Sequence, residues 1–252
     1  MALGPDEQRR YARQIQLPGF GEDAQSAIKA ARVLVVGAGG LGAPLLSYLA
    51  AAGVGTLGIV DHDRLELSNL NRQIVHETGD IGRLKAESAR DRVEELNPLT
   101  QVVTYAEKLA GANAEHIISQ FDVVADGCDN FESRFAVNRA CIALRKPLVS
   151  AAVRGWDGQL ATFAPHLHDD APCYQCLVSP NAPEINTCRD AGIIGPLCGI
   201  IGSMQALEVI HVILGTPQLV GKLLVYSARN FSQRMLTLPR DPQCNACHAS
   251  IA

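Results

Sequence analysis

The sequence has no excess of basic residues. Its 252 residues include 22 Lys and Arg against 26 Asp and Glu, which gives a formal net charge of -4. Proteins that bind the phosphate backbone of DNA or RNA normally carry a clustered positive excess. We therefore expect no nucleic acid partner, although a mildly acidic protein can still hold a local cationic pocket for a nucleotide.

The sequence also lacks an apolar segment at its start, because Met1 to Arg10 is polar and contains no signal-like run. The most apolar stretch, residues 191–214, is interrupted by Pro196, Gln205 and Glu208, which favours a buried core helix over a membrane span. We therefore expect a cytoplasmic protein with no membrane partner. A reducing compartment disfavours disulfides, so metal or catalytic roles are expected for some of the eight cysteines.

No internal repeat and no clear linker divides the sequence, so we expect one domain over residues 1–252. Short β-branched runs alternate with helical stretches, which is typical of a doubly wound, mostly parallel sheet. The expected fold class is therefore α/β and Rossmann-like. Strands are expected at 31–37, 56–60, 102–105, 122–125, 147–153 and 159–163, and helices at 43–52, 84–96, 115–120 and 134–144.

The two ends of the sequence depart from this alternation. The first thirty residues have the pattern of two short helices, and residues 166–190 have the composition of a long crossover loop. An apolar helix is expected over 191–214. Residues 222–227 and 233–238 are expected to form a hairpin, which would extend the sheet in an antiparallel direction.

A glycine-rich turn follows the first expected strand. Gly37, Gly39 and Gly42 form a G-x-G-x-x-G pattern between that strand and a helix. Glycine permits the tight turn and lets backbone N–H groups approach phosphate oxygens at the positive end of the helix. Asp61, at the end of the second strand, supplies the carboxylate that such sites use to accept hydrogen bonds from a ribose.

A run of polar side chains after the second strand indicates which nucleotide chemistry to expect. Asn69, Asn71, Arg72 and Gln73 lie close together, and Lys85 opens the next helix. In nucleotidyl transfer, charge develops on the α-phosphate and on the departing pyrophosphate, and fixed cations and donors stabilise it.

A third element of this chemistry is Asp129, which follows another strand and could hold Mg²⁺ through a hard oxygen ligand. Two other functions compete with nucleotidyl transfer: an NAD-linked oxidoreductase and a non-catalytic nucleotide-binding scaffold. Hydride transfer does not need this set of charges, and a scaffold would not need to keep Arg72, Lys85 and Asp129 together.

Four cysteines form two C-x-x-C pairs, Cys173 with Cys176 and Cys244 with Cys247, separated by 67 residues. Two such pairs are the pattern of a tetrahedral structural zinc site, but the long separation makes the spacing alone only suggestive. Haem attachment at Cys244-Asn-Ala-Cys-His248 and a redox dithiol are the alternatives. Haem attachment would need export, and neither pair opens a helix after a core strand.

Eight segments in order resemble the ThiF/MoeB/HesA family, relatives of the ubiquitin-activating enzymes, over nearly the whole chain. The matching segments are Arg10–Gln14, Gly37–Gly42, Asp61–Asp63, Leu67–Gln73 with Lys85, Cys128–Asn130, Cys173–Cys176, Thr187–Pro196 and Cys244–Cys247. The chain departs from the family pattern at Asn71, where Gln is frequent, and at Gly127-Cys128, where Cys-Thr is usual. Neither change removes a charge.

The resemblance implies an adenylyltransferase that acts on the terminal glycine of a ubiquitin-like sulfur-carrier protein with a Gly-Gly end (ThiS- or MoaD-like). It implies a homodimer, in which Arg13 acts in the partner's site. Because the sequence ends at Ala252 and no rhodanese domain follows, we expect a separate sulfurtransferase as the sulfur source. The resemblance also supports the zinc interpretation of the four paired cysteines. The residues it assigns to ATP are Gly40, Asp61, Asn71, Arg72, Lys85, Asp129 and Asn130.

Cys188 is a candidate for a later covalent step. It lies beside Arg189 ahead of an expected helix start, and both features favour thiolate. Its thiolate could displace AMP to form a thioester, or carry sulfur as a persulfide. The alternative is an exposed loop cysteine with no catalytic task.

Overall fold

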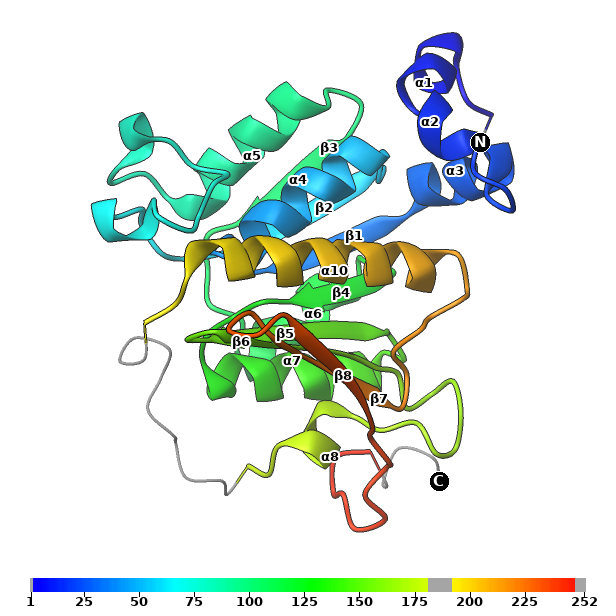
Figure 1. Cartoon of the computed structure of the whole chain (residues 1–252), viewed down its shortest axis with the longest axis vertical. Helices are drawn as coiled ribbons and strands as arrows, with labels where there is room; N and C mark the ends of the chain where they lie inside the picture. The colour runs from blue at the N-terminus through cyan, green and yellow to red at the C-terminus, as the bar shows by residue number, and fades with distance from the viewer. Residues whose placement is uncertain (1, 181–191, 248–252) are drawn as a thin grey trace.

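The computed structural model describes residues 2–180 and 192–247, and it places eight strands in one sheet (Figure 1). The strand order is β3-β2-β1-β4-β5-β6-β7-β8. The first five strands in this order run parallel, and β6, β7 and β8 add antiparallel. The strands are β1 (Arg32–Val36), β2 (Thr56–Val60), β3 (Gln101–Tyr105), β4 (Val123–Asp126), β5 (Leu148–Arg154), β6 (Asp157–Phe163), β7 (Lys222–Ser227) and β8 (Ser232–Thr237). This confirms the expected sheet, including its antiparallel C-terminal part.

Helices cover both faces of the sheet, which explains why the central strands are apolar without alternation. In β1, Val33 and Val35 pack into one hydrophobic core, whereas Leu34 and Val36 pack into the other. The first core contains side chains of α3, α4, α5 and α10, and the second those of α6 and α7. The helices are α1 (Pro5–Arg10), α2 (Ala12–Ile15), α3 (Gly21–Ala30), α4 (Gly42–Ala52), α5 (Lys85–Leu96), α6 (Gly111–Ile118), α7 (Phe131–Ala143), α8 (Tyr174–Leu177) and α10 (Gly195–Ile213), with 3-10 turns η1 (Leu67–Asn69) and η2 (Thr78–Asp80).

This arrangement creates a switch point between β1 and β4. The connection after β1 crosses one face of the sheet through α4, and the connection after β4 crosses the other face through α7. The two loops therefore diverge at the carboxyl ends of adjacent strands. In open α/β sheets this crevice is where ligands bind.

The apolar helix α10 lies across the sheet in Figure 1. Within the described residues it is the one helix that is long and apolar enough to cross a membrane. Two of its buried polar side chains contact the sheet. Gln205 donates to the Val149 carbonyl oxygen at 3.0 Å, and Glu208 accepts from Thr162 Oγ1 at 2.7 Å. These contacts make α10 a core helix of the α/β fold.

Several element boundaries differ from the expected ones. The N-terminal region forms three helices rather than two, and α8 lies inside the expected long loop. Helix α7 begins at Phe131 rather than near Arg134, because Asn130 caps it by accepting from the Ser133 backbone N–H at 2.9 Å. Glu132, Ser133 and Arg134 make most of the first turn of α7 polar, so the sustained apolar pattern begins only after it.

Candidate nucleotide and metal sites

The glycine turn after β1 packs directly against the loop after β4. Gly37 has φ 96°, and a Cβ at Gly37 would lie 3.5 Å from the Gly127 carbonyl. A Cβ at Gly42 would lie 1.9 Å from the Gly37 oxygen, so no larger residue fits there. The predicted turn therefore forms, and it places the N-terminus of α4 at the switch point.

Two predicted side chains lie against this turn. A Cβ on Gly40 would lie 3.4 Å from Arg72 Cγ and 2.9 Å from Cys198 Sγ, and a Cβ on Gly39 would lie 3.6 Å from Gln73 Nε2. Gln73 is 4% exposed, and its Oε1 is buried without a hydrogen-bond partner in the described part of the chain. An unpaired buried amide is costly. A polar ligand over the turn would satisfy it, so the turn and Gln73 fit a nucleotide.

Asp61 connects the turn to β2. Its Oδ2 accepts from the Ala38 N–H at 2.8 Å, and its Oδ1 accepts from the Asp63 N–H at 2.9 Å. Burial raises the pKa of Asp61, and the nearby Lys85 ammonium opposes this shift. The carboxylate thus holds the turn in place and keeps lone pairs for a further hydrogen-bond donor.

The two predicted cations differ in their surroundings. The Lys85 side chain is 8% exposed, and its Nζ donates to Asp63 Oδ2 at 2.9 Å. Arg72 is half-buried, and its Nη1 donates to the Ser68 carbonyl oxygen at 2.9 Å and to Asn71 Oδ1 at 3.0 Å. Lys85 therefore forms an ion pair with a carboxylate, whereas Arg72 donates hydrogen bonds to uncharged oxygens.

Two of the predicted asparagines have structural tasks as well. Asn69 Oδ1 accepts from the Glu66 N–H at 3.1 Å in the 3-10 turn η1, and Asn130 caps α7. Asp129, the residue before Asn130, is exposed, and its side chain has no hydrogen bond or ion pair within residues 2–180 and 192–247. Its role as a magnesium ligand stays a prediction. A second group of possible metal ligands is Asp61, His62 and Asp63, whose ligand atoms lie within 4.8 Å of one another.

Sequence reasoning missed His76. Its Nε2 lies 2.9 Å from the Ala38 carbonyl oxygen, so this nitrogen donates, and its Nδ1 lies 2.8 Å from Ser88 Oγ. Burial lowers the pKa of His76. A neutral imidazole therefore links the glycine turn to α5. A single histidine in a polar segment carries no pattern that would reveal this contact.

The four paired cysteines gather into one cluster, although the two pairs are 67 residues apart. The Sγ atoms are 3.6 Å apart for Cys173 and Cys244, 3.7 Å for Cys176 and Cys247, and 3.9 Å for Cys173 and Cys176. Tetrahedral zinc with Zn–S bonds of about 2.3 Å requires sulfurs about 3.8 Å apart. These distances are far too long for a disulfide, at about 2.05 Å. The cluster therefore has the geometry of a tetrahedral thiolate site.

The structure does not bring two of the predicted catalytic residues, Arg13 and Cys188, to the glycine turn. Cys188 lies outside the described residues. Arg13 is exposed on α2. The next residue on this helix, Gln14, donates to the Ala52 carbonyl oxygen at the C-terminal end of α4. Because α4 has 11 residues, this end is about 16 Å from the glycine turn. The chain's own fold does not bring Arg13 to its own turn.

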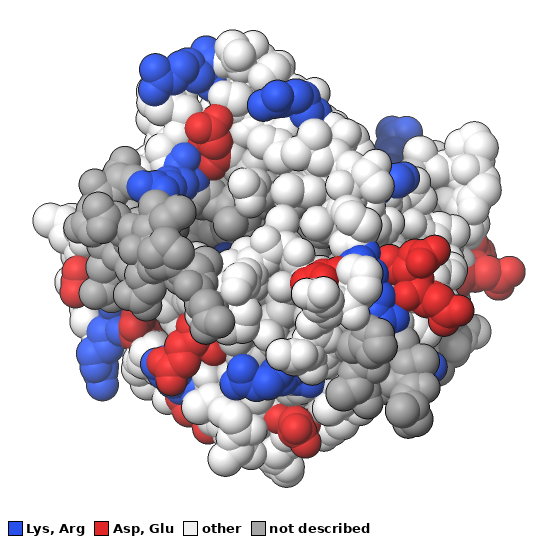
Figure 2. Space-filling model, turned by 90° about the horizontal axis from the view of Figure 1, so that it is seen from below, with Lys and Arg blue, Asp and Glu red and all other residues white. Residues whose placement is uncertain are grey.

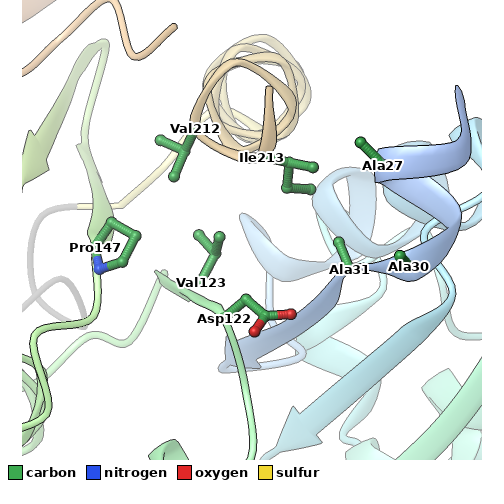
Figure 3. A pocket seen from close by; sticks show the side chains of 8 residues that line it. All are labelled: Ala27, Ala30, Ala31, Asp122, Val123, Pro147, Val212 and Ile213. Carbon is green, nitrogen blue, oxygen red and sulfur yellow. The ribbon is translucent and has the colours of Figure 1, made fainter. Parts of the chain in front are cut away.

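A separate cleft of about 290 Å³ lies at the amino ends of β1, β4 and β5, the end of the sheet opposite to the glycine turn (Figure 3). It is lined by Ala27, Ala30, Ala31, Asp122, Val123, Pro147, Val212 and Ile213. Asp122 is the charged lining residue, and its carboxylate accepts from the Arg32 N–H. The cleft thus offers mainly aliphatic surface, and none of the predicted nucleotide contacts lies in it.

The fold is shared with proteins of solved structure. The crystal structure of E. coli MccB with ATP matches with a TM-score of 0.81 and 22% sequence identity, covering 95% of this chain and 74% of that chain. The structure of PaaA matches with a TM-score of 0.78 and 22% identity, covering 94% and 75%. At this identity the likeness concerns the fold alone.

Closer relatives are found by sequence. The chain is 45% identical over 247 residues to the sulfur carrier protein adenylyltransferase of Thermus thermophilus, covering 96% of this chain and 91% of that protein. It is 43% identical over 249 residues to the probable adenylyltransferase/sulfurtransferase MoeZ of Mycobacterium tuberculosis, covering 96% of this chain but 62% of that longer protein. The ThiF family matches residues 11–246. The chain belongs to the ThiF family.

Proposed function

We propose that this protein is an ATP-dependent adenylyltransferase that activates the C-terminal glycine carboxylate of a small ubiquitin-like sulfur-carrier protein. The observation that carries the proposal is the glycine turn at the switch point of the sheet, against which Arg72 packs. Lys85 lies near the Asp61 carboxylate that holds this turn, and the loop that carries Asp129 packs against Gly37. The name of the Thermus thermophilus relative supports the same reaction. Residues 1–252 act as one adenylation unit.

The site divides the reaction among its residues. Backbone N–H groups of the turn and the N-terminus of α4 bind the phosphates, and Asp61 accepts from the ribose. The carrier carboxylate attacks the α-phosphorus, the bond to the β-phosphate oxygen breaks, and pyrophosphate leaves. Lys85 and Arg72 stabilise the charge that develops in this step. Mg²⁺, held by Asp129, would neutralise phosphate charge when bound.

The remaining predicted contacts surround these groups. Gln73 satisfies its buried amide on the nucleotide, and the polar run of Asn69 and Asn71 keeps Arg72 directed toward Gly40. Asn130 presents its amide nitrogen to the nucleotide while its oxygen caps α7. Lys85 exchanges its contact with Asp63 for the more highly charged triphosphate.

Zinc is the metal that best suits the four-cysteine cluster, because all four ligands are thiolates and no position is left open for chemistry. Cys173, Cys176, Cys244 and Cys247 would hold it, and its role is structural. When bound, it would connect the segment around α8 to the segment that follows β8.

A homodimer would give Arg13 a site to act on. Because α2 sits at the end of α4 that is remote from the glycine turn, Arg13 reaches a nucleotide only in another copy. Exposed apolar side chains on neighbouring helices supply surface for such contact: Tyr48 on α4 is 58% exposed, and Leu207 on α10 is 57% exposed.

The carrier protein is the second macromolecular partner. Figure 2 views the molecule from the side of α8, and the middle of this face carries few charged side chains. Such a surface suits a folded protein domain better than a polyanion. Sulfur is then delivered by a sulfurtransferase, and the reaction takes place in the cytoplasm.

Isotope exchange tests the reaction. Purified protein with Mg-ATP and a carrier ending in Gly-Gly should exchange labelled pyrophosphate into ATP, because adenylate formation is reversible. A carrier shortened by its final glycine serves as the matched control and should give no exchange. If no member of a carrier panel supports exchange, the proposed reaction is wrong and a non-catalytic nucleotide-binding scaffold is the better interpretation. NAD binding without exchange would indicate an oxidoreductase.

A covalent step at Cys188 is tested separately. Adenylation needs no thiol, so Cys188→Ala should keep pyrophosphate exchange within about twofold of the wild-type rate. It should lose any reductant-sensitive adduct between enzyme and carrier on a non-reducing gel. An identical adduct in the alanine variant would leave Cys188 without a covalent role.

A further inference from the structure

A buried ion pair lies beneath the loop that carries Asp129 and Asn130. Arg134, one turn into α7, has a side chain that is 8% exposed, and its Nη1 lies 3.1 Å from Oδ2 of Asp126. Asp126 is 1% exposed at the end of β4. Ser150, its neighbour on β5, donates to the same carboxylate at 3.1 Å and accepts from Arg134 Nη1 at 2.9 Å.

This ion pair binds both backbone groups of Cys128, the residue before Asp129. The Asp126 carboxylate accepts from the Cys128 N–H at 2.9 Å, and Arg134 Nη2 donates to the Cys128 carbonyl oxygen at 2.5 Å. The same Nη2 donates to the Ala151 carbonyl oxygen on β5 at 2.8 Å. The residue directly before Asp129 is therefore fixed to two strands of the sheet.

A buried ion pair contributes little net stability to a fold, because removing each ion from water costs several kcal/mol. Apolar residues of similar volume often stabilise a fold equally well. The value of the ion pair here lies in its directions: a guanidinium can join two carbonyls, a hydroxyl and a carboxylate in one plane. We propose that Arg134 is a positioning residue for nucleotide binding, which sets the place of Asp129 and Asn130 without touching ATP. This rests on the proposed function of that loop.

The four-cysteine cluster braces this arginine. The Arg134 Cζ lies 5.8 Å from the centroid of the Tyr174 ring, within the range of a cation–π contact. Tyr174 follows Cys173 directly, and its backbone N–H donates to Asn138 Oδ1, one turn further along α7, at 2.9 Å. Tyr174 also makes edge contact with Phe135 at 5.7 Å. The cluster and the nucleotide loop are therefore fixed to the same stretch of α7.

Calorimetric titration of the full-length protein with Mg-ATP tests the proposal. Arg134→Lys keeps the charge but cannot reach all of these partners, and it should raise the Kd for Mg-ATP about tenfold, the scale of residues that act on a ligand indirectly. Arg139→Lys, at an exposed position of the same helix, is the matched control and should bind like wild type. Tyr174→Leu should raise the Kd by a smaller factor, about threefold.

A double-mutant cycle separates positioning from general loss of stability. If Arg134 acts through the loop, Arg134→Lys should weaken binding much less in an Asp129→Ala background than in wild type. Effects that simply multiply would overturn the proposal, as would an unchanged Kd in folded Arg134→Lys.

Two further outcomes are decided by the same titrations. If Arg134→Lys does not fold, Ser150→Ala takes its place in the double-mutant cycle with Asp129→Ala, and the Kd for Mg-ATP is compared in the same way. Wild-type protein that binds no Mg-ATP would overturn the proposed function together with this inference. Wild-type binding that Arg134→Lys and Ser150→Ala both leave unchanged would overturn the inference alone.

Discussion

Lys85→Ala should lower carrier-dependent ATP–pyrophosphate exchange by about 10²-fold or more, the scale of losing one fixed charge-stabilising donor. The Lys85 ammonium is nearly buried, so water screens it poorly and its attraction for phosphate is strong. Removing it also leaves the carboxylates of Asp61 and Asp63 without this cation beside the nucleotide. Arg72→Ala should produce a loss of similar size, because its side chain lies over Gly40.

Matched variants isolate the role of charge at this position. Arg92→Ala removes an exposed cation from the same helix, where it pairs with Glu95, and should leave exchange unchanged. Lys85→Ala combined with Asp63→Asn removes the negative charge of Asp63 as well. It should recover part of the affinity for ATP, while kcat stays low. Exchange at the wild-type rate in both Lys85→Ala and Arg72→Ala would contradict the proposed reaction.

The central sheet and the glycine turn were predictable because local rules determine them. A buried parallel strand such as Arg32–Val36 must be apolar on both faces, and Gly42 must be glycine because a Cβ would meet the Gly37 oxygen. The sequence pattern alone identifies these features. It also placed Asp61 at a strand end, where the structure brings it to the turn.

Features that depend on contacts between distant segments were not predictable. Arg134 reads as an ordinary helix arginine, and its partner Ser150 becomes its neighbour only when β4 and β5 pair. His76 likewise acquires its role by meeting Ala38 across the fold. The spacing of Cys176 and Cys244 left their proximity open, since nothing local brings residues so far apart together.

The metal is predicted to have the other large effect, on stability. Cys176→Ser should lose zinc and lower the melting temperature by roughly 10 °C. Joining Cys176 to Cys244 closes a segment of 67 residues, and in the chain-entropy view a cross-link over a loop of this length stabilises the folded state by about 4 kcal/mol. For a protein of this size each kcal/mol corresponds to about 2–4 °C.

Metal analysis and calorimetry of the same samples check this prediction. The wild-type protein should contain close to one zinc per chain, and a chelator should reproduce the thermal shift of Cys176→Ser. Cys141→Ala is the matched control, because Cys141 is a buried cysteine on α7 outside the cluster. It should lose stability through a small cavity but keep its zinc. Wild-type protein that is metal-free and melts at the same temperature as Cys176→Ser would show that the four thiols are ordinary core residues.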